Sequence, residues 1–321
     1  MTDSPAAPRL SVIIPNWNGL ALLRPCLDAL RGQTHPSYEV IVVDNASTDG
    51  SVAALVREHP EVRVLALPTN TGYAGGCNAG IGAARGAILV VTNNDTEADP
   101  AWLTELDAAL ARHPECGSAA SRLMIHRDRT RLHSAGDLVR RDGTADSRGV
   151  WQPYGPPYDA ECEVFGPCGG AAAYRRELLE AVGLFDESFF MYMEDVDLSW
   201  RAQLAGWRCI YAPKSVVYHH LSATGGGALA SYYVGRNTLW VIARNYPAAL
   251  LRRDWPKIAR AQARIAWGAL RAIRGPAARA RLRGQIAGLF TSLRWLGYRR
   301  RQMRRLRPSA AALAHIEQIL E

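Results

Sequence analysis

The chain has 321 residues, of which 48% are hydrophobic, which is enough for one large domain with an appendage or for two domains. No uncharged apolar run reaches the length of about 18 residues that a membrane-spanning helix needs, and the first ten residues lack the apolar core of a signal peptide. The net charge of +8 is unevenly distributed along the chain. Residues 252–321 hold 17 Lys and Arg against 3 Asp and Glu, whereas residues 1–251 carry a net charge of −6. This difference indicates a boundary before an Arg-rich tail.

The first 125 residues alternate between apolar strands and helical patterns. The predicted strands are Leu10–Pro15, Val40–Val43, Val62–Leu67 and Ile88–Val91. Helices are predicted over 20–30, from 52, within the glycine-rich 72–86, and from 100. This alternation favours an α/β fold with a parallel, doubly wound sheet, in which ligands bind beyond the carboxyl ends of the strands. Three polar clusters fall at such ends, at 15–18, 44–45 and 93–95.

The second part of the chain is less regular. Residues 126–163 are polar and are predicted to form short strands and loops. A glycine-rich stretch at Phe165–Tyr174 precedes a helix at Arg175–Val182. Short strands are predicted at Trp207–Tyr211 and Ser215–Tyr218, the second leading into two histidines. The six cysteines show no C-x-x-C pair or zinc-finger spacing, so we expect reduced, mostly buried thiols.

An aromatic run between Phe185 and Arg201 ends abruptly in three acids, Glu194, Asp195 and Asp197. Acids at a helix start are stabilised by its free backbone N–H groups, which is one explanation. The other is that Asp195 is a carboxylate aimed at a reactive group as a general base. Asp197 and Arg201 are four residues apart on this helix and are expected to pair structurally.

Two residues near the first strands are candidates for binding a nucleobase. Asp44 follows a strand, and is either a turn acid or a carboxylate that accepts a hydrogen bond from the imide N–H of uracil or thymine. Trp17 either packs in the core or stacks on that base. The two alternatives stay open for each residue.

Residues after later strands are candidates for metal and phosphate binding. Asp95 suits a hard divalent cation. His219 becomes a second ligand only if the fold brings it beside Asp95. A carboxylate and an imidazole together suit manganese better than calcium. Further on, Arg236 either pairs with a phosphate or lies on the surface. A diphosphate cradle or a flexible loop is predicted at His220, Ser222, Thr224 and Gly225–Gly227.

Taken in order, several motifs resemble the family 2 inverting glycosyltransferases of GT-A fold, over about residues 9–240. The matching segments are Ser11–Asn18, Val42–Gly50, Asn70–Asn78, Asn93–Asp95, Gly183–Glu187, Met193–Asp197 and His219. Within that family the chain is most similar to bacterial rhamnosyltransferase-type enzymes that build cell-wall or surface polysaccharide. The resemblance implies a mostly parallel Rossmann-like sheet flanked by helices, with a nucleotide-binding half at 9–125 and an acceptor-binding half at 126–240.

The resemblance also implies a role for each matching residue. The base would be held by Pro15, Trp17 and Asp44, and the ribose or phosphates would be held by Asn78 and Asn94. A divalent Mn2+ or Mg2+ would be bound by Asp95 and His219. The acceptor would be bound by Glu194, Gly169 and Gly170. The segment N-N-D replaces the family's D-x-D, which leaves one carboxylate fewer and makes His219 more necessary. Asp195 aligns with the catalytic base, so a single displacement would invert the anomeric carbon.

The implied donor is a dTDP- or UDP-linked sugar, with rhamnose favoured by the resemblance alone. The implied acceptor is either a saccharide or a polyprenyl-linked molecule. One alternative is a non-catalytic nucleotide-sugar or glycan-binding module. Another is a nucleotidyltransferase, which would need a basic phosphate loop after the first strand, where 16–19 is uncharged.

The tail, residues 241–321, is predicted to form basic amphipathic helices. An apolar stripe recurs at helical spacing through Leu282, Ile286, Leu289, Leu293 and Leu296, with arginines beside it. Such helices suit an anionic membrane surface, so we expect a cytoplasmic protein, peripheral on the inner face of the cell membrane. The alternative is that the stripe packs on the catalytic domain or on another subunit of a homo-oligomer. No recognition motif accompanies the arginines, so nucleic acid is not expected as a partner.

Overall fold

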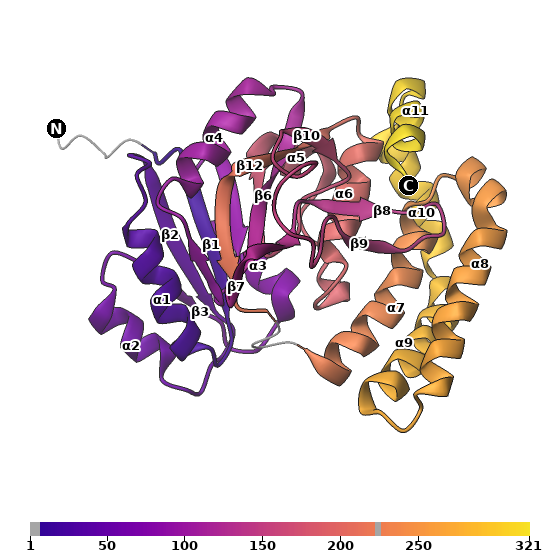
Figure 1. The fold of residues 1–321 in the computed structure, drawn as a ribbon, viewed down its shortest axis with the longest axis horizontal. Helices are drawn as coiled ribbons and strands as arrows, with labels where there is room; N and C mark the ends of the chain where they lie inside the picture. Colours follow the sequence, from indigo (N-terminus) through magenta and orange to yellow (C-terminus); the bar gives the residue numbers. More distant parts are fainter. Residues whose placement is uncertain (1–6, 222–225) are drawn as a thin grey trace.

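The computed structural model describes residues 7–221 and 226–321, which form a mixed α/β sheet with helices on both faces and a group of helices beside it (Figure 1). Within these residues the large sheet has the strand order β10-β12-β6-β11-β4-β1-β2-β3, with β5 paired to β12 and β7 to β6. Its strands are β1 (Leu10–Asn16), β2 (Tyr38–Asp44), β3 (Arg63–Ala66), β4 (Ile88–Thr92), β5 (Thr96–Ala98), β6 (Cys116–Ile125), β7 (Asp128–Ser134), β10 (Cys162–Val164), β11 (Ala171–Arg175) and β12 (Arg208–His219). A separate hairpin joins β8 (Asp137–Val139) and β9 (Ala145–Ser147).

Eleven α-helices are assigned within the described residues. They are α1 (Leu20–Arg31), α2 (Ser51–Glu58), α3 (Gly72–Ala83), α4 (Trp102–Arg112), α5 (Arg176–Val182), α6 (Glu194–Leu204), α7 (Gly227–Asn245), α8 (Ala248–Arg271), α9 (Pro276–Ser292), α10 (Trp295–Leu306) and α11 (Ala310–Ile319). The helices predicted from the sequence around residues 20, 52, 72 and 100 are therefore present.

The N-terminal half has the predicted alternation because its strands are covered on both faces. In β1, Val12 and Ile14 pack into one core cluster together with residues of α1 and α4, whereas Ile13 packs into another with α3. The parallel pairing of β1 with β2 sets Asn16 opposite Asp44. Polar residues at the ends of these strands are thereby gathered at one edge of the sheet.

The sheet differs from a purely parallel one. β11 lies between β4 and β6 and is antiparallel to both. The two strands predicted at 207–211 and 215–218 are one strand, β12, whose register shifts between Ala212 and Val216. Pro213 lies in this irregular stretch, and it has no N–H to give to a ladder, which explains the break in the sequence pattern. All six cysteines are free.

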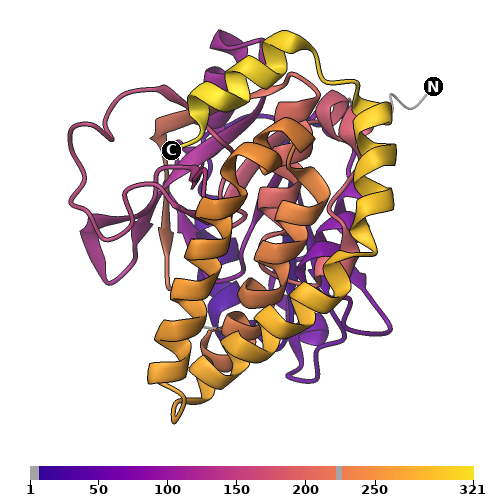
Figure 2. The same ribbon diagram turned by 90° about the vertical axis from the view of Figure 1, so that its right-hand side faces the viewer.

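The tail is helical, as predicted, and it packs against the rest of the molecule. α7 runs through residue 240, where the sequence placed the start of the tail. Residues before and after that position, including Trp200, Trp240, Leu250 and Ile316, share one core cluster. Figure 2 shows α8 and α9 joined by a turn at one end and running apart from it along this part of the molecule. Among the described residues, no helix combines the length and apolar composition that crossing a bilayer requires.

Part of the predicted apolar stripe, in α9 and at the residue that follows it, faces outward. The inward face packs on α7 through glycines so closely that a Cβ on Gly284 would lie 2.1 Å from the carbonyl oxygen of Tyr232. Ile286, Leu289 and Leu293 of the stripe are between 56% and 73% exposed. These three side chains therefore do not pack on the catalytic half of the chain.

Candidate active site

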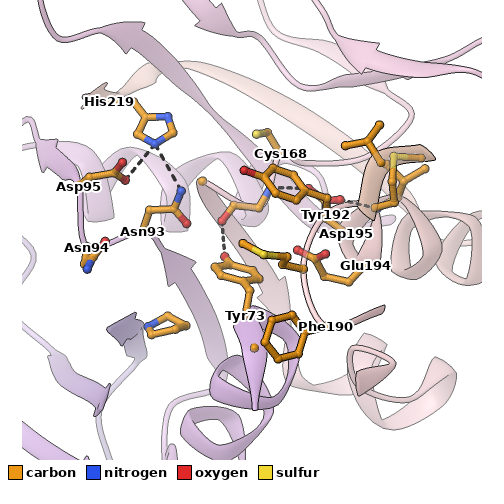
Figure 3. Close-up of a pocket in the computed structure, with 18 of the residues that line it drawn as sticks. Tyr73, Asn93, Asn94, Asp95, Cys168, Phe190, Tyr192, Glu194, Asp195 and His219 are labelled. Carbon is orange, nitrogen blue, oxygen red and sulfur yellow. Dashed lines mark hydrogen bonds and ion pairs between the residues drawn. The ribbon is translucent and has the colours of Figure 1, made fainter. Parts of the chain in front are cut away.

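A cavity of about 660 Å3 lies at the sheet edge where β1, β4 and β12 end, and the start of α6 forms its opposite wall (Figure 3). This volume suits a ligand of nucleotide-sugar size. The structure brings nine predicted site residues together in its lining, namely Pro15, Trp17, Asn94, Asp95, Gly169, Gly170, Glu194, Asp195 and His219. The cavity therefore joins the predicted metal-binding, acceptor-binding and catalytic residues.

Asp95 and His219 face each other at one end of the cavity. Asp95 follows β4, His219 ends β12, and Asp95 Oδ1 lies 3.0 Å from His219 Nε2. Both side chains are more than 90% buried. Burial opposes ionisation of Asp95, but the hydrogen bond and charge of His219 outweigh it and lower the pKa of this carboxyl. A carboxylate oxygen and an imidazole nitrogen thus point at one place.

His133 supports His219 from behind. The Nδ1 atoms of the two rings lie 3.0 Å apart. Burial, together with the charge of His219, lowers the pKa of His133 to about 3, so His133 is neutral at physiological pH. If His219 binds a metal through Nε2, its proton is on Nδ1 and His133 is the acceptor that fixes this tautomer.

The segment before α6 has an unusual backbone. Phe190, Tyr192 and Met193 all have positive φ angles, between 64° and 71°, which are costly for residues with large side chains. Asn237 of α7 holds this turn, because its Nδ2 donates to the carbonyl oxygens of Phe189, Met191 and Tyr192 at 2.7 to 3.1 Å. The turn delivers the first residues of α6 into the cavity.

Asp195 lies in the first turn of α6 with its carboxylate in the cavity wall. Oδ2 accepts a hydrogen bond from the N–H of Gly169 at 2.9 Å, and Oδ1 accepts one from the N–H of Val196 at 2.8 Å. Burial raises the pKa of Asp195, and the two backbone N–H groups partly offset this effect. Only glycine fits beside it easily, since a Cβ on Gly169 would lie 3.1 Å from Oδ2. Asp195 therefore accepts a hydrogen bond from a free N–H group at the helix start and also lines the cavity.

The two neighbouring acids differ from each other. Glu194 is buried, and its Oε2 has no hydrogen-bond partner among the described residues. Burial and the charge of Asp195 raise the pKa of Glu194 well above its usual value. Asp197 is fully buried and pairs with Arg201 at 2.9 Å, as predicted, and with Arg244 at 3.2 Å.

The candidates for base binding lie at the end of β1. Trp17 is about half exposed in the cavity lining. Asn94 donates from Nδ2 to Asn16 Oδ1 at 2.7 Å, and Asn16 donates to Asp44 Oδ1 at 3.2 Å. Asp44 also accepts from the N–H of Ser47 at 2.9 Å and does not itself line the cavity. It therefore lies behind Asn16.

Two further predicted nucleotide-binding residues lie away from the lining. Both polar atoms of the Asn78 amide bond the backbone of Phe185, at 2.8 and 3.1 Å. The guanidinium of Arg236 donates to the carbonyl oxygens of Ser188 and Phe189 and lies over the ring of Trp240. Both residues instead support the segment before α6. Of the predicted diphosphate cradle, Ser222, Thr224 and Gly225 lie outside the described residues, and His220 bonds Glu97.

Sequence reasoning missed other residues of the cavity. The hydroxyl of Tyr73 donates a hydrogen bond to the carbonyl oxygen of Gly169. Tyr73 lies within the segment Asn70–Asn78 that resembles the family, and this resemblance could have identified it as a site residue. Asp137 of β8 also lines the cavity, and burial followed by the charge of Asp195 raises its pKa well above the usual value. The irregular segment around Asp137 offered no local signal for this position.

Comparison with known proteins agrees with this geometry. The family model described as glycosyl transferase family 2 matches residues 11–183, and one described as glycosyl transferase family group 2 matches residues 160–314. An N-acetylglucosaminyl-diphospho-decaprenol L-rhamnosyltransferase of Mycobacterium tuberculosis is 32% identical over 245 residues, covering 70% of this chain and 80% of that protein. An O-antigen biosynthesis protein of Myxococcus xanthus is 32% identical over 68% of this chain and 18% of its own length.

Solved structures share the fold. A mannosyltransferase from Pyrobaculum calidifontis in complex with GDP-Man and Mn2+ matches with a TM-score of 0.54 and 21% identity, over 98% of this chain and 80% of that one. The S. aureus TarS fragment in complex with UDP-GlcNAc matches with a TM-score of 0.54 and 18% identity, over 78% of this chain and 71% of that one. The family match sets aside the alternatives of a non-catalytic module and a nucleotidyltransferase. The chain belongs to glycosyl transferase family 2 and is a glycosyltransferase that uses a nucleotide sugar.

Proposed function

We propose that the protein is an inverting glycosyltransferase that moves a sugar, with rhamnose as the first candidate, from a dTDP- or UDP-sugar to a lipid-linked saccharide. The observation that carries this proposal is that the Asp195 carboxylate shares one cavity with the Asp95–His219 pair. The name of the 32% identical mycobacterial relative supports both rhamnose and a polyprenyl-linked acceptor.

Asp95 and His219 fit a divalent ion such as Mn2+ or Mg2+. Their ligand atoms already lie 3.0 Å apart, and an oxygen and a nitrogen donor from rigid strand ends suit manganese in particular. When bound, such an ion would neutralise the charge that develops on the departing diphosphate. His133 would orient His219 for this contact, and the Mn2+ named with the mannosyltransferase structure supports the assignment.

In this proposal Asp195 is the general base. Its raised pKa makes its carboxylate a stronger base than an exposed Asp, while the N–H groups of Gly169 and Val196 fix its orientation. It would take the proton of the acceptor hydroxyl as that oxygen attacks the anomeric carbon from the face opposite the diphosphate. Glu194 would bind the acceptor, and Gly169 and Gly170 would leave room for it.

The base would lie at the end of β1. Trp17 presents a half-exposed ring for stacking, beside Pro15 in the lining. Asp44, linked to the cavity through Asn16, remains the predicted acceptor for the imide N–H of uracil or thymine. Asn94 remains the predicted partner of the ribose.

A donor panel tests the proposal. Calorimetric binding of UDP-, dTDP- and GDP-sugars, with and without Mn2+, should select one uracil- or thymine-containing donor, and Asp95→Asn should remove the metal-dependent part of its affinity. NMR of the product should show an inverted anomeric centre. A folded protein that binds no donor, or a product with retained configuration, would overturn the proposal.

We also propose that the tail docks the enzyme on an anionic membrane, at the cytoplasmic face where lipid-linked acceptors would be reached. Residues 255–316 contain 15 Lys and Arg and no Asp or Glu. Trp255, Trp267 and Leu270 of α8 are also exposed, and Gln285 of α9 donates to Gln262 Oε1 of α8 at 2.9 Å, which joins the two helices. Apolar side chains bordered by arginines are the composition of interfacial helices.

Liposome flotation of the full chain tests this docking. We expect binding to vesicles with anionic lipid, little binding to neutral vesicles, and release at high salt, because about 1 kcal/mol per basic residue comes from the surface potential. Trp267→Ser should weaken binding, whereas Trp151→Ser, which changes an exposed tryptophan outside the tail, should not. Equal binding to neutral vesicles, or no binding to anionic ones at low salt, would refute it.

A further inference from the structure

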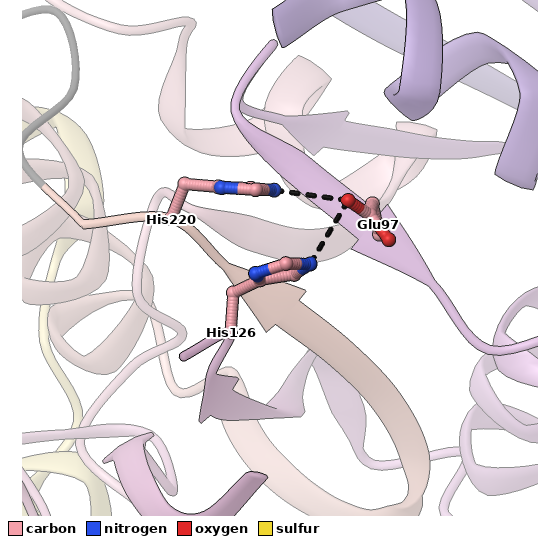
Figure 4. A group of neighbouring side chains, drawn as sticks. All are labelled: Glu97, His126 and His220. Carbon is pink, nitrogen blue, oxygen red and sulfur yellow. Dashed lines mark hydrogen bonds and ion pairs between the residues drawn. The ribbon is translucent and has the colours of Figure 1, made fainter. Parts of the chain in front are cut away.

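We propose that Glu97, His126 and His220 form a second metal site, suited to Zn2+ and separate from the Asp95–His219 pair. The three side chains come from three segments of the chain: β5, the residue after β6, and the residue that follows His219 at the end of β12 (Figure 4). The proposal does not depend on the glycosyltransferase mechanism.

The ligand atoms already converge. His220 Nε2 lies 2.9 Å and His126 Nε2 lies 3.0 Å from the same oxygen, Oε1 of Glu97. Zinc binds imidazole nitrogen and carboxylate oxygen at about 2.0–2.2 Å in a tetrahedral arrangement, which separates its ligand atoms by roughly 3.3 Å. The separations of Glu97 Oε1 from the two ring nitrogens are therefore within a few tenths of an ångström of those in a zinc site.

The backbone holds the three residues in place before any ion binds. The N–H of His220 donates to the carbonyl oxygen of Asp95, and the N–H of His126 donates to that of His219, both at 2.9 Å. Glu97 is paired with Tyr218 across the β5–β12 ladder. Sites built on strand ends are more precise than sites on free loops, so only side-chain rotation is needed here.

Two features of the cluster have to change when an ion binds. The imidazole rings are stacked, with centroids 3.7 Å apart and planes at 20°, so they must tilt apart to direct both nitrogens at one ion. Both are partly exposed, which leaves them free to rotate. Arg129 faces the other carboxylate oxygen, Oε2 of Glu97, at 3.8 Å and does not occupy the oxygen that the histidines share.

The donor set selects the metal. Two imidazoles and one carboxylate form the ligand set of many zinc sites, with a fourth position left for water, whereas Mg2+ and Ca2+ prefer oxygen ligands alone. A bound ion would tie together β5, β6 and β12 beside Asp95 and His219. We therefore expect zinc to stabilise the cation-binding end of the cavity.

Calorimetric titration of the EDTA-stripped full chain with Zn2+ tests the site. In a chain that carries Asp95→Asn and His219→Asn, one equivalent should still bind. Adding His126→Gln or His220→Gln should weaken that binding at least about tenfold. His113→Gln is the matched control, because His113 also pairs with a glutamate, Glu161, at 2.9 Å but lies outside the cluster.

A second measurement keeps the test decisive if the double variant does not fold. In the otherwise unchanged chain, His126→Gln should lower the zinc stoichiometry by one equivalent and remove the zinc-dependent rise in the unfolding temperature, while His113→Gln should do neither. Zinc binding that disappears completely with Asp95 and His219, or that is equal in His126→Gln and His113→Gln, would overturn the proposal.

Discussion

Asn237 should control activity without touching substrate. Its side-chain amide donates to three backbone carbonyls in the turn before α6, and that turn contains Phe190, Tyr192 and Met193 in the left-handed region. Residues with side chains pay on the order of 1–3 kcal/mol each for such a backbone. Asn237→Leu keeps a similar side-chain volume and removes the amide that holds the turn.

The magnitude follows from the hydrogen bonds. The Asn237 amide has two N–H groups, each worth about 1 kcal/mol net when hydrogen-bonded, so removing them should destabilise the protein by about 2 kcal/mol. The released strain should let the turn relax and move Asp195, and misplacing a reacting group by about 1 Å can cost a factor of about 100 in rate. We expect the turnover of Asn237→Leu to fall by between tenfold and about 100-fold, with donor affinity little changed.

Urea unfolding and steady-state kinetics would measure both effects. Thr238→Val is the matched control, because Thr238 is the next buried residue of α7 and, among the described residues, its hydroxyl bonds only Val234 of the same helix. If Asn237→Leu matches Thr238→Val in stability and in turnover, the reasoning about the turn is wrong.

Three further predictions concern the cavity. The folded protein holds the Asp195 proton more tightly than the unfolded chain, so the free energy of unfolding falls as the pH rises above 3.8, the ordinary pKa of an Asp carboxyl. Asp195→Asn should therefore be more resistant to urea than wild type at pH 7 but not at pH 3. Gly169→Ala, whose Cβ would press on the Asp195 carboxylate, should lower turnover about tenfold at unchanged donor affinity, measured by kinetics and calorimetry. His133→Phe should weaken Mn2+ binding about tenfold in a calorimetric titration of the protein alone, and unchanged affinity would exclude His133 as the support of His219.

The sequence predicted the parts of the fold that have a local signal. β1, β2 and β4 are apolar runs because helices cover both faces of a parallel sheet, and their polar ends locate the cavity. β11 was not predicted because its residues, Ala171–Arg175, show no alternation and are placed by antiparallel pairing with β4 and β6. β5 has three residues, too few for any periodicity.

The candidate site shows the same limit at the level of side chains. An arginine or asparagine near a phosphate loop is a reasonable nucleotide ligand, yet Arg236 and Asn78 bond backbone groups of the segment 185–189. That segment meets α3 and α7 only in the folded chain. The role of Asn237 likewise depends on the crossing of α7 past a distant turn, which no pattern in the sequence reports.

The central claim is that Asp195 removes the acceptor proton. Single-turnover transfer, with saturating donor and Mn2+, tests it in Asp195→Asn, with Asp146→Asn as the control for losing a carboxylate from the cavity lining. The account predicts that Asp195→Asn binds donor as wild type does and transfers between about 100-fold and 10,000-fold more slowly, while Asp146→Asn stays within a few-fold of wild type. Transfer by Asp195→Asn at the wild-type rate would contradict the account.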